Sequence, residues 1–245
     1  MPLETLALLS VAILVIAFLY SSVGHAGASG YIAVMSLAEL APAQIKPTAL
    51  VLNILVACLG SWQFYRAGYF SWKLFWPFAF LSIPMAFLGG YLSLPAHVFK
   101  IIVGIVLLAS AANFLWRPSD DEMDHEPTRP VSIAVGGGLG LLAGLTGTGG
   151  GIFLTPLLLL MRWAKTKTAS ATSAVFILVN STAGLLGNAS ATKQIPGFVV
   201  PLAFAALIGG SVGAWLGSRR LRPDVIKRLL AVVLLIAGLK LVFGG

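Results

Sequence analysis

The chain contains two similar glycine-rich stretches, GHAGASGYI at residues 24–32 and LTGTGGGIF at residues 145–153. Each stretch opens a short apolar segment, and a longer apolar segment with an asparagine, Asn53 or Asn180, comes next. The second half of the chain therefore repeats the first, with a shift of about 120–128 residues. A duplicated glycine-rich element is the first indication of how this chain is organised.

The composition around the repeat is typical of an integral membrane protein. Of 245 residues, 58% are hydrophobic and 10% are charged, and the mean hydropathy is +0.94. Soluble domains carry about 25% charged residues, so a soluble enzyme, a disordered protein and a disulfide-rich secreted module are excluded. The net charge of +8 is interpreted as loop lysines and arginines that orient the chain and contact anionic lipid, with no nucleic-acid partner.

The segments predict an all-α polytopic membrane protein. A bilayer core about 30 Å thick needs roughly 20 apolar residues in a helix, and continuous apolar runs argue against a membrane β-barrel. The second and seventh segments are too short to cross comfortably alone. About ten helical segments are predicted, at residues 5–24, 28–41, 47–65, 73–94, 98–116, 131–146, 150–163, 170–188, 197–217 and 225–243.

A hydrophilic linker at residues 117–130 divides the chain into a first transmembrane repeat, 1–116, and a second, 131–245. If all ten segments cross, 12 of the 16 lysines and arginines lie on the linker's side; if the two short segments are re-entrant and only eight cross, the split is 10 to 6. The positive-inside rule then predicts a cytoplasmic linker and both termini outside. Five crossings per half is an odd number, so the two repeats are inverted, as in many secondary transporters.

The glycine-rich stretches are predicted to break the helices at membrane depth. Four glycines within residues 147–151 are a poor helix interior, and irregular backbone in a bilayer must be buried in protein or line a polar cavity. The short helices would then present free N–H groups that attract an anion. The predicted substrate-binding residues are Gly24, His25, Gly27, Ser29, Gly30, Asn53, Thr146, Gly147, Thr148, Gly149, Gly150, Gly151 and Asn180.

Alternatives stay open for several of these residues. His25 is either an anion contact, a proton-responsive group or a neutral interfacial histidine. Asn53 and Asn180 could equally bridge neighbouring helices by hydrogen bonds. Scattered glycines such as Gly89 and Gly90 are predicted to serve close helix packing instead.

The acidic residues indicate the charge of the substrate. Outside the linker they are Glu4, Glu39 and Asp224, which lie near segment ends. No carboxylate falls in the middle of an apolar run, whereas cation pathways and many proton pumps use intramembrane Asp or Glu. An anionic substrate is therefore expected.

The glycine-rich motifs and the segments that follow them resemble those of a known family. GHAGASGYI followed by Lys46-Pro47-Thr48, repeated as GLTGTGGGIFLTPLLLL and then KTASATS at 167–173, resembles the TauE/SafE family of sulfite exporters over essentially the whole chain. The resemblance implies a multi-pass permease of the cell inner membrane that moves sulfite or a small organosulfonate outward, driven by an ion or potential gradient. The site residues that it carries over are those of the two glycine-rich motifs.

A passive anion channel and a membrane enzyme are the alternative function classes. A passive anion channel, or a carrier of another small anion, would use the same polar midplane. A membrane enzyme would need a nucleophile with a base or a metal cluster. With one cysteine, Cys58, and three separated histidines, we predict no catalytic residue, metal site or cofactor. The expected partners are the small anion and the lipid bilayer.

Overall fold

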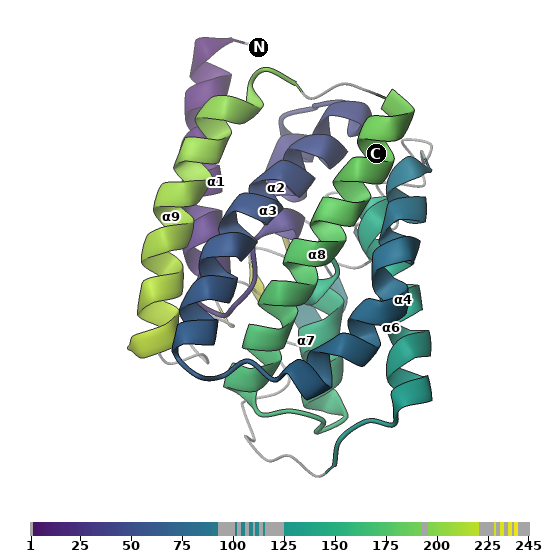
Figure 1. Ribbon diagram of the computed structural model, residues 1–245. Coiled ribbons are helices and arrows are strands. Elements are labelled where there is room, and N and C mark those ends of the chain that lie inside the picture. The colour runs from purple at the N-terminus through teal and green to yellow at the C-terminus, as the bar shows by residue number, and fades with distance from the viewer. Residues whose placement is uncertain are drawn as a thin grey trace.

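The chain is all-helical wherever the structure describes it. The computed structural model describes residues 2–92, 125–192 and 196–220, with scattered positions within 101–115 and 228–239. These residues form eight α-helices and no β-strand. In the labels of Figure 1 the helices are α1 (Leu3–Ser21), α2 (Ala28–Leu37), α3 (Pro42–Arg66), α4 (Trp72–Tyr91), α6 (Arg129–Thr146), α7 (Gly151–Leu160), α8 (Thr166–Thr192) and α9 (Val199–Arg219).

Each of these helices coincides with one predicted segment. The other two predicted segments, 98–116 and 225–243, lie outside the continuously described residues, so the count of ten and the inversion of the repeats stay predictions. Helix α3 begins earlier than predicted because Pro42 occupies its first turn, where the missing N–H of proline removes no hydrogen bond.

Helices α2 and α7 are as short as the sequence indicates. Each has ten residues and a length of about 15 Å, half the thickness of a bilayer core. They end earlier than predicted because the chain turns at a residue in the left-handed region, Glu39 (φ 58°) after α2 and Arg162 (φ 52°) after α7. The other six described helices are long and apolar enough to span a membrane.

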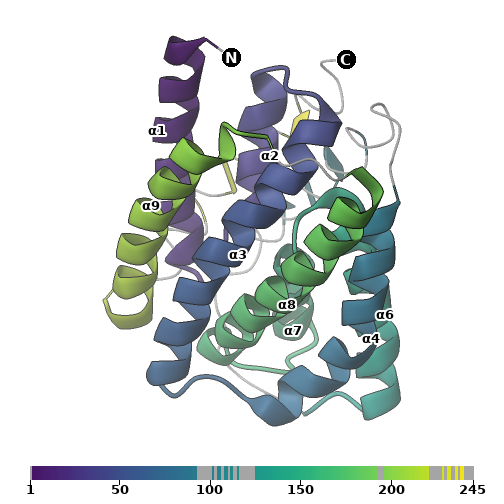
Figure 2. The same cartoon turned by 45° about the horizontal axis from the view of Figure 1, so that its top comes forward.

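Two outer helix pairs flank a central pair (Figures 1 and 2). On one side of the bundle α1 packs against α9, and on the opposite side α4 packs against α6. Between them, α3 and α8 cross each other and contact α9 and α4, respectively. Every one of these pairs joins a helix from before the predicted linker to one from after it, so the two halves of the chain interlock.

Glycine stripes hold the outer pairs together. On α6, Gly136, Gly140 and Gly144 are so close to α4 that a Cβ at each would overlap the backbone carbonyl of Phe78, Ser82 or Ala86. On α9, Gly209, Gly213 and Gly217 meet the carbonyls of Leu14, Phe18 and Ser22 of α1 in the same way. The four-residue spacing on both partners shows that each pair runs parallel, and small residues permit the close approach. The packing role predicted for the scattered glycines is confirmed.

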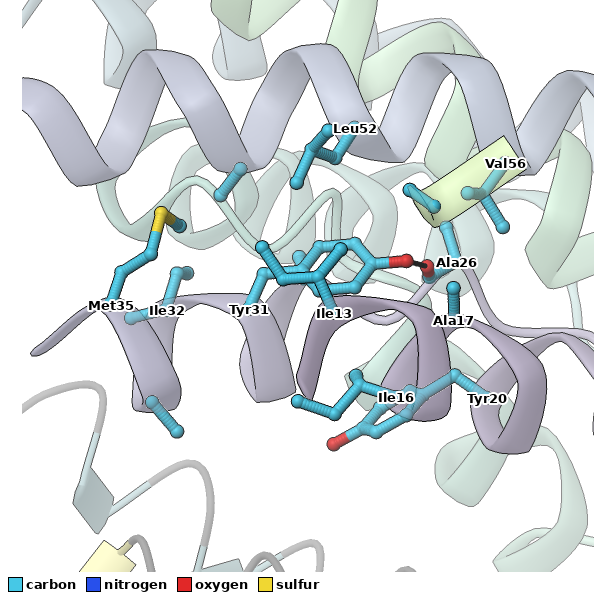
Figure 3. Close-up of a cluster of buried hydrophobic side chains, with 14 of the residues drawn as sticks. Ile13, Ile16, Ala17, Tyr20, Ala26, Tyr31, Ile32, Met35, Leu52 and Val56 are labelled. Carbon is cyan, nitrogen blue, oxygen red and sulfur yellow. Dashed lines mark hydrogen bonds between the residues drawn. The ribbon is translucent and has the colours of Figure 1, made fainter. Parts of the chain in front are cut away.

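A buried cluster around α1, α2 and α3 fixes the first short helix (Figure 3). The ring of Tyr31 is fully buried, and its hydroxyl donates to the Ala26 carbonyl at 2.6 Å. Tyr20 is also buried, with its hydroxyl 2.8 Å from Ser29 Oγ. Two tyrosines therefore anchor the turn between α1 and α2 on both sides.

The surface of the helices fits a lipid environment. Large apolar side chains are exposed on the outer helices, among them Leu8, Val11 and Val15 of α1 and Phe80 of α4. The C-terminal ends of α3 and α9 and the N-terminal ends of α4, α6 and α8 lie together at the lower end in Figure 1. These ends carry the basic residues Arg66, Lys73, Arg129, Lys165, Lys167 and Arg219. Such a one-sided distribution of basic charge is typical of a multi-pass membrane protein.

Candidate functional site

Two glycine turns interrupt the helices, as predicted. The first glycine turn, residues 22–27, joins α1 to α2 and has Gly24 at φ 80° and Gly27 at φ 103°. The second glycine turn, residues 147–150, joins α6 to α7 with Gly147, Gly149 and Gly150 at φ 73–81°. A residue with a side chain is strained at these angles, so glycine is strongly favoured there. All thirteen predicted site residues are buried.

Each short helix begins directly at its turn. Gly27 caps α2 and Gly150 caps α7, both in the left-handed region and neither with a side-chain cap. The first backbone N–H groups of a helix have no partner within the helix, so both turns present N–H donors and the positive end of a helix dipole.

The first glycine turn is bound to the second half of the chain. His25 Nε2 lies 2.8 Å from Thr155 Oγ1 of α7, and that hydroxyl donates to Ser173 Oγ of α8 at 2.7 Å. Because the Thr155 hydrogen is directed at Ser173, His25 Nε2 carries the hydrogen of the first bond. Ser170 Oγ donates to the Val23 carbonyl at 2.9 Å. A chain of buried hydroxyls and one imidazole thus connects the two repeats.

The second glycine turn is bound to the first half. Asn53 Nδ2 of α3 donates to the Thr148 carbonyl at 3.1 Å and to Ser181 Oγ of α8 at 3.3 Å. A Cβ on Gly149 would lie 2.5 Å from Ser181 Oγ and 2.8 Å from Asn53 Nδ2. The turn therefore fits between α3 and α8 at their crossing, with glycine as its only sterically acceptable residue.

The two turns are packed in matching ways. A Cβ on Gly24 would meet Ser170 near the start of α8 at 2.5 Å, and one on Gly147 would meet Lys46 near the start of α3 at 3.3 Å. Each turn thus rests on the N-terminal part of the long helix of the other repeat. This exchange places both glycine turns at the interface between the repeats.

Other predicted site residues have local partners. Ser29 Oγ pairs with Tyr20 as described above, and a Cβ on Gly30 would meet Ile16 Cγ2 at 2.5 Å, in the apolar cluster. Asn180 Nδ2 donates to the Phe176 carbonyl of its own helix at 2.9 Å. These contacts account for the burial of Ser29, Gly30 and Asn180.

The remaining members lie within the second turn or beside it. Thr146 Oγ1 donates to the Leu142 carbonyl at 2.7 Å and lies 2.9 Å from Thr148 Oγ1. A Cβ on Gly150 would be 2.8 Å from the Phe176 ring, and one on Gly151 would overlap Ile177. The later residues of the second turn, Gly149 and Gly150, and the first residue of α7, Gly151, are therefore in contact with α8.

Lys46 and Lys167, which follow the two short helices, have different surroundings. Lys46 is 6% exposed, and its Nζ donates to the carbonyls of Gly89 and Gly90 at 2.9 Å and of Leu92 at 2.8 Å. Lys167 Nζ donates to Tyr69 Oη at 3.1 Å and lies 4.8 Å from the ring centroid. Lys46 therefore caps the C-terminal end of α4 with all three of its N–H bonds.

This cap predicts a large loss of stability for Lys46→Met. Methionine leaves three backbone carbonyls at the end of α4 without their donor, which costs about 3 kcal/mol and lowers Tm by about 10 °C. Lys73→Met is the matched control, because its ion pair with Glu126 is 74% and 46% exposed and contributes less than about 1 kcal/mol. Thermal unfolding in detergent measures both, and equal shifts would contradict the capping role.

The buried polar groups are neutral or cationic. Among the described residues they comprise serines, threonines, asparagines, His25 and Lys46, and no buried carboxylate. The described acids Glu4, Glu39 and Glu126 are all exposed. No group of three or more His, Cys, Asp or Glu side chains that could hold a metal ion occurs within the described part of the chain.

The hydroxyls of Thr155, Ser170 and Ser173 were not among the predicted site residues. A signal for two of them exists in the sequence, because Ser170, Ser173, Ile177 and Ser181 are spaced three or four apart and share one face of α8. That face lies along both glycine turns. This row of small hydroxyl side chains is therefore a sequence signal that α8 lies along the two glycine turns.

Comparison with known proteins agrees with this architecture. The chain matches the family described as "Sulfite exporter TauE/SafE" over residues 9–241. A relative from Sinorhizobium fredii (strain NBRC 101917 / NGR234), "Probable membrane transporter protein y4hK", is 41% identical over 240 residues, which cover 96% of this chain and 97% of that protein.

A second relative matches in part. "Probable membrane transporter protein YunE" of Bacillus subtilis (strain 168) is 32% identical over 120 residues, 47% of this chain and 42% of that protein. No solved structure matches the chain. With an all-helical fold, six apolar spanning helices and a match over nearly its whole length, this multi-pass membrane protein belongs to the TauE/SafE sulfite exporter family of transporters.

Proposed function

We propose that this protein is a secondary transporter that exports a small sulfur-containing anion, sulfite or an organosulfonate, by alternating access. The observation that carries the proposal is the pair of short helices that begin at buried left-handed glycines. Sulfite and sulfonates present several acceptor oxygens and negative charge, which suit backbone N–H groups at helix N-termini. The family to which the chain belongs supports the substrate class and the outward direction.

The electrostatics of the interior support an anion. A carboxylate near the bilayer centre would repel it, and the described acids are exposed instead. Asn53 and Asn180 are fully buried, and the Oδ1 atom of each has no hydrogen-bond partner among the described residues. Each of these amide oxygens can accept a hydrogen bond from water or from a protonated oxygen of the substrate. The predicted site residues therefore form a polar interior without negative charge.

The interlocked helices support alternating access. Carriers with inverted repeats move one repeat against the other around a central site. Here each glycine turn rests on the long helix of the other repeat, so relative movement of the repeats changes the surroundings of both turns. We propose ten crossings in two inverted repeats, with the linker in the cytoplasm.

Transport by purified protein in liposomes tests the proposal. Vesicles loaded with ³⁵S-sulfite should release it at a rate that saturates with internal sulfite and responds to an imposed ion or potential gradient. Sulfate, phosphate and acetate should compete poorly. A rate that rises linearly with concentration and, at a fixed membrane potential, is unaffected by gradients of other ions would favour the passive channel, and no sulfite or sulfonate flux would contradict the substrate class.

A further inference from the structure

A basic, aromatic pocket lies at the C-terminal ends of α3 and α9. Its volume is about 430 Å³, and Trp62, Gln63, Arg66, Ala67, Trp215, Ser218 and Arg219 line it. The two helices belong to different repeats and lie side by side. The two helices end at Arg66 and Arg219, at the lower end in Figure 1, where the basic helix ends lie together.

The arginines of this pocket are held by tryptophans and not by acids. The Arg66 guanidinium lies 5.6 Å from the ring centroid of Trp62, and those of Arg219 and Arg220 lie 6.0 Å and 5.9 Å from that of Trp215. No carboxylate forms an ion pair with these arginines among the described residues. Arg66 and Arg219 line the pocket, and their guanidinium groups can bind a phosphate by bidentate hydrogen bonds. Arg220, on the Trp215 ring, adds positive charge next to Arg219.

An apolar stripe leads from the membrane into the pocket. Along α9, Phe204, Ile208, Val212 and Trp215 are exposed, with relative exposures of 64%, 59%, 49% and 43%, and Arg219 follows four residues later. A spacing of three or four residues keeps these side chains on one helix face. The stripe runs along a spanning helix, so an acyl chain lying on it would bring a headgroup to the arginines.

We propose that this pocket binds the headgroup of an anionic diacyl phospholipid, such as phosphatidylglycerol. The phosphate contacts Arg66 and Arg219, and one acyl chain follows Val212, Ile208 and Phe204. Basic pockets of membrane proteins recognise anionic headgroups in this way. A free phosphate would use the guanidinium groups but not the stripe, which is why the structure favours a lipid. The bound lipid bridges α3 and α9 and so joins the two repeats at their rim.

Thermal unfolding with defined lipids tests this. The purified wild-type protein in a mild nonionic detergent is titrated with phosphatidylglycerol or with phosphatidylcholine of the same acyl chains. Phosphatidylglycerol at about 100 times its Kd should raise Tm by about 5 °C more than phosphatidylcholine does. Arg66→Gln and Arg219→Gln should each weaken that effect about tenfold in lipid concentration. Lys165→Gln, which removes one exposed charge from the same face, should leave it unchanged.

Three results would overturn the proposal. Equal stabilisation by both lipids would show that the protein does not recognise the headgroup, and this comparison needs only the wild-type protein. An undiminished effect in both arginine variants would show that the lipid does not bind in this pocket. A similar shift with inorganic phosphate alone shows a free-anion site instead of a lipid site. Native mass spectrometry of the wild-type protein gives an independent readout, with one retained phosphatidylglycerol per chain expected and equal retention of both lipids as the contradicting result.

Discussion

Gly150→Ala is expected to reduce sulfite efflux about a hundredfold, the loss that corresponds to roughly 2.7 kcal/mol at the transport barrier. Gly150 has φ 81°, where a side chain costs about 1–2 kcal/mol. Its Cβ would also lie 2.8 Å from the Phe176 ring and 3.1 Å from Ala143 Cβ. To relieve both contacts the turn must move, and the N–H groups at the start of α7 move with it. Efflux from liposomes at matched protein density measures the effect.

The matched control is Gly138→Ala. Gly138 lies on an exposed face of α6, and a Cβ there would meet nothing within 4 Å. Alanine in place of a helical glycine stabilises by about 0.5–1 kcal/mol, so this variant should transport normally. Both variants should elute as folded protein in size-exclusion chromatography. Normal efflux by Gly150→Ala would show that the second glycine turn is not part of the transport site.

The second large effect is expected for Thr155→Val, which keeps the shape of the side chain and deletes its hydroxyl. His25 Nε2 and Ser173 Oγ then lose their shared partner in a buried place, at a cost of about 1–3 kcal/mol. Since this hydroxyl ties the first glycine turn to α7 and α8, its loss should lower efflux at least about tenfold and Tm by about 5 °C. Efflux assays and thermal unfolding of the same preparations test both numbers.

Two companion variants separate the bond from general effects on the helix. Thr155→Ser retains a hydroxyl and should restore most of the efflux. Thr182→Val makes the same substitution on the exposed face of α8, where the hydroxyl bonds only the Leu178 carbonyl of its own helix at 2.8 Å. It should be silent. If Thr155→Val and Thr182→Val transported equally well, the connection between the repeats through His25 would have no functional role.

Much of the backbone could be predicted because the relevant signals are local. Glycine runs at 24–30 and 147–151 interrupt an apolar pattern, and the structure breaks the helices there at positive φ. Segment lengths indicated that α2 and α7 are too short to cross a bilayer comfortably alone, and each has ten residues. The short helices still end sooner than predicted, because the left-handed residues Glu39 and Arg162 carry no glycine or proline signal.

The sequence repeat was a poor guide to the lysines. Lys46 lies seven residues before Asn53, whereas Lys167 lies thirteen before Asn180, so the two lysines occupy different levels on their helices. Lys46 consequently reaches the end of α4, while Lys167 stacks on Tyr69. The different spacing is visible in the sequence, but the partners on α4 depend on how distant segments pack.

The hydrogen bonds of the site could not be predicted for a related reason. Thr155 is a single hydroxyl in an apolar segment and Ser173 is one of several on α8, and most such hydroxyls bond their own helix, as Thr182 and Ser190 do. Whether a hydroxyl bonds across helices depends on which face meets a neighbour. His25, in contrast, was identifiable, because it is an ionisable side chain within a glycine-rich turn.

Binding of small anions to the purified protein tests whether the glycine turns form an anion site. Thermal unfolding is measured with sulfite, sulfoacetate, taurine, sulfate, phosphate and acetate, on the wild-type protein and on the Gly150→Ala and Thr155→Val variants. A ligand that binds only the folded protein raises the free energy of unfolding, by about 2.7 kcal/mol at 100 times its Kd, and Tm rises with it. We expect a selective rise with sulfite or a sulfonate that both variants lose. Equal or absent shifts for all six compounds, or a shift that both variants retain, would contradict an anion site at the glycine turns.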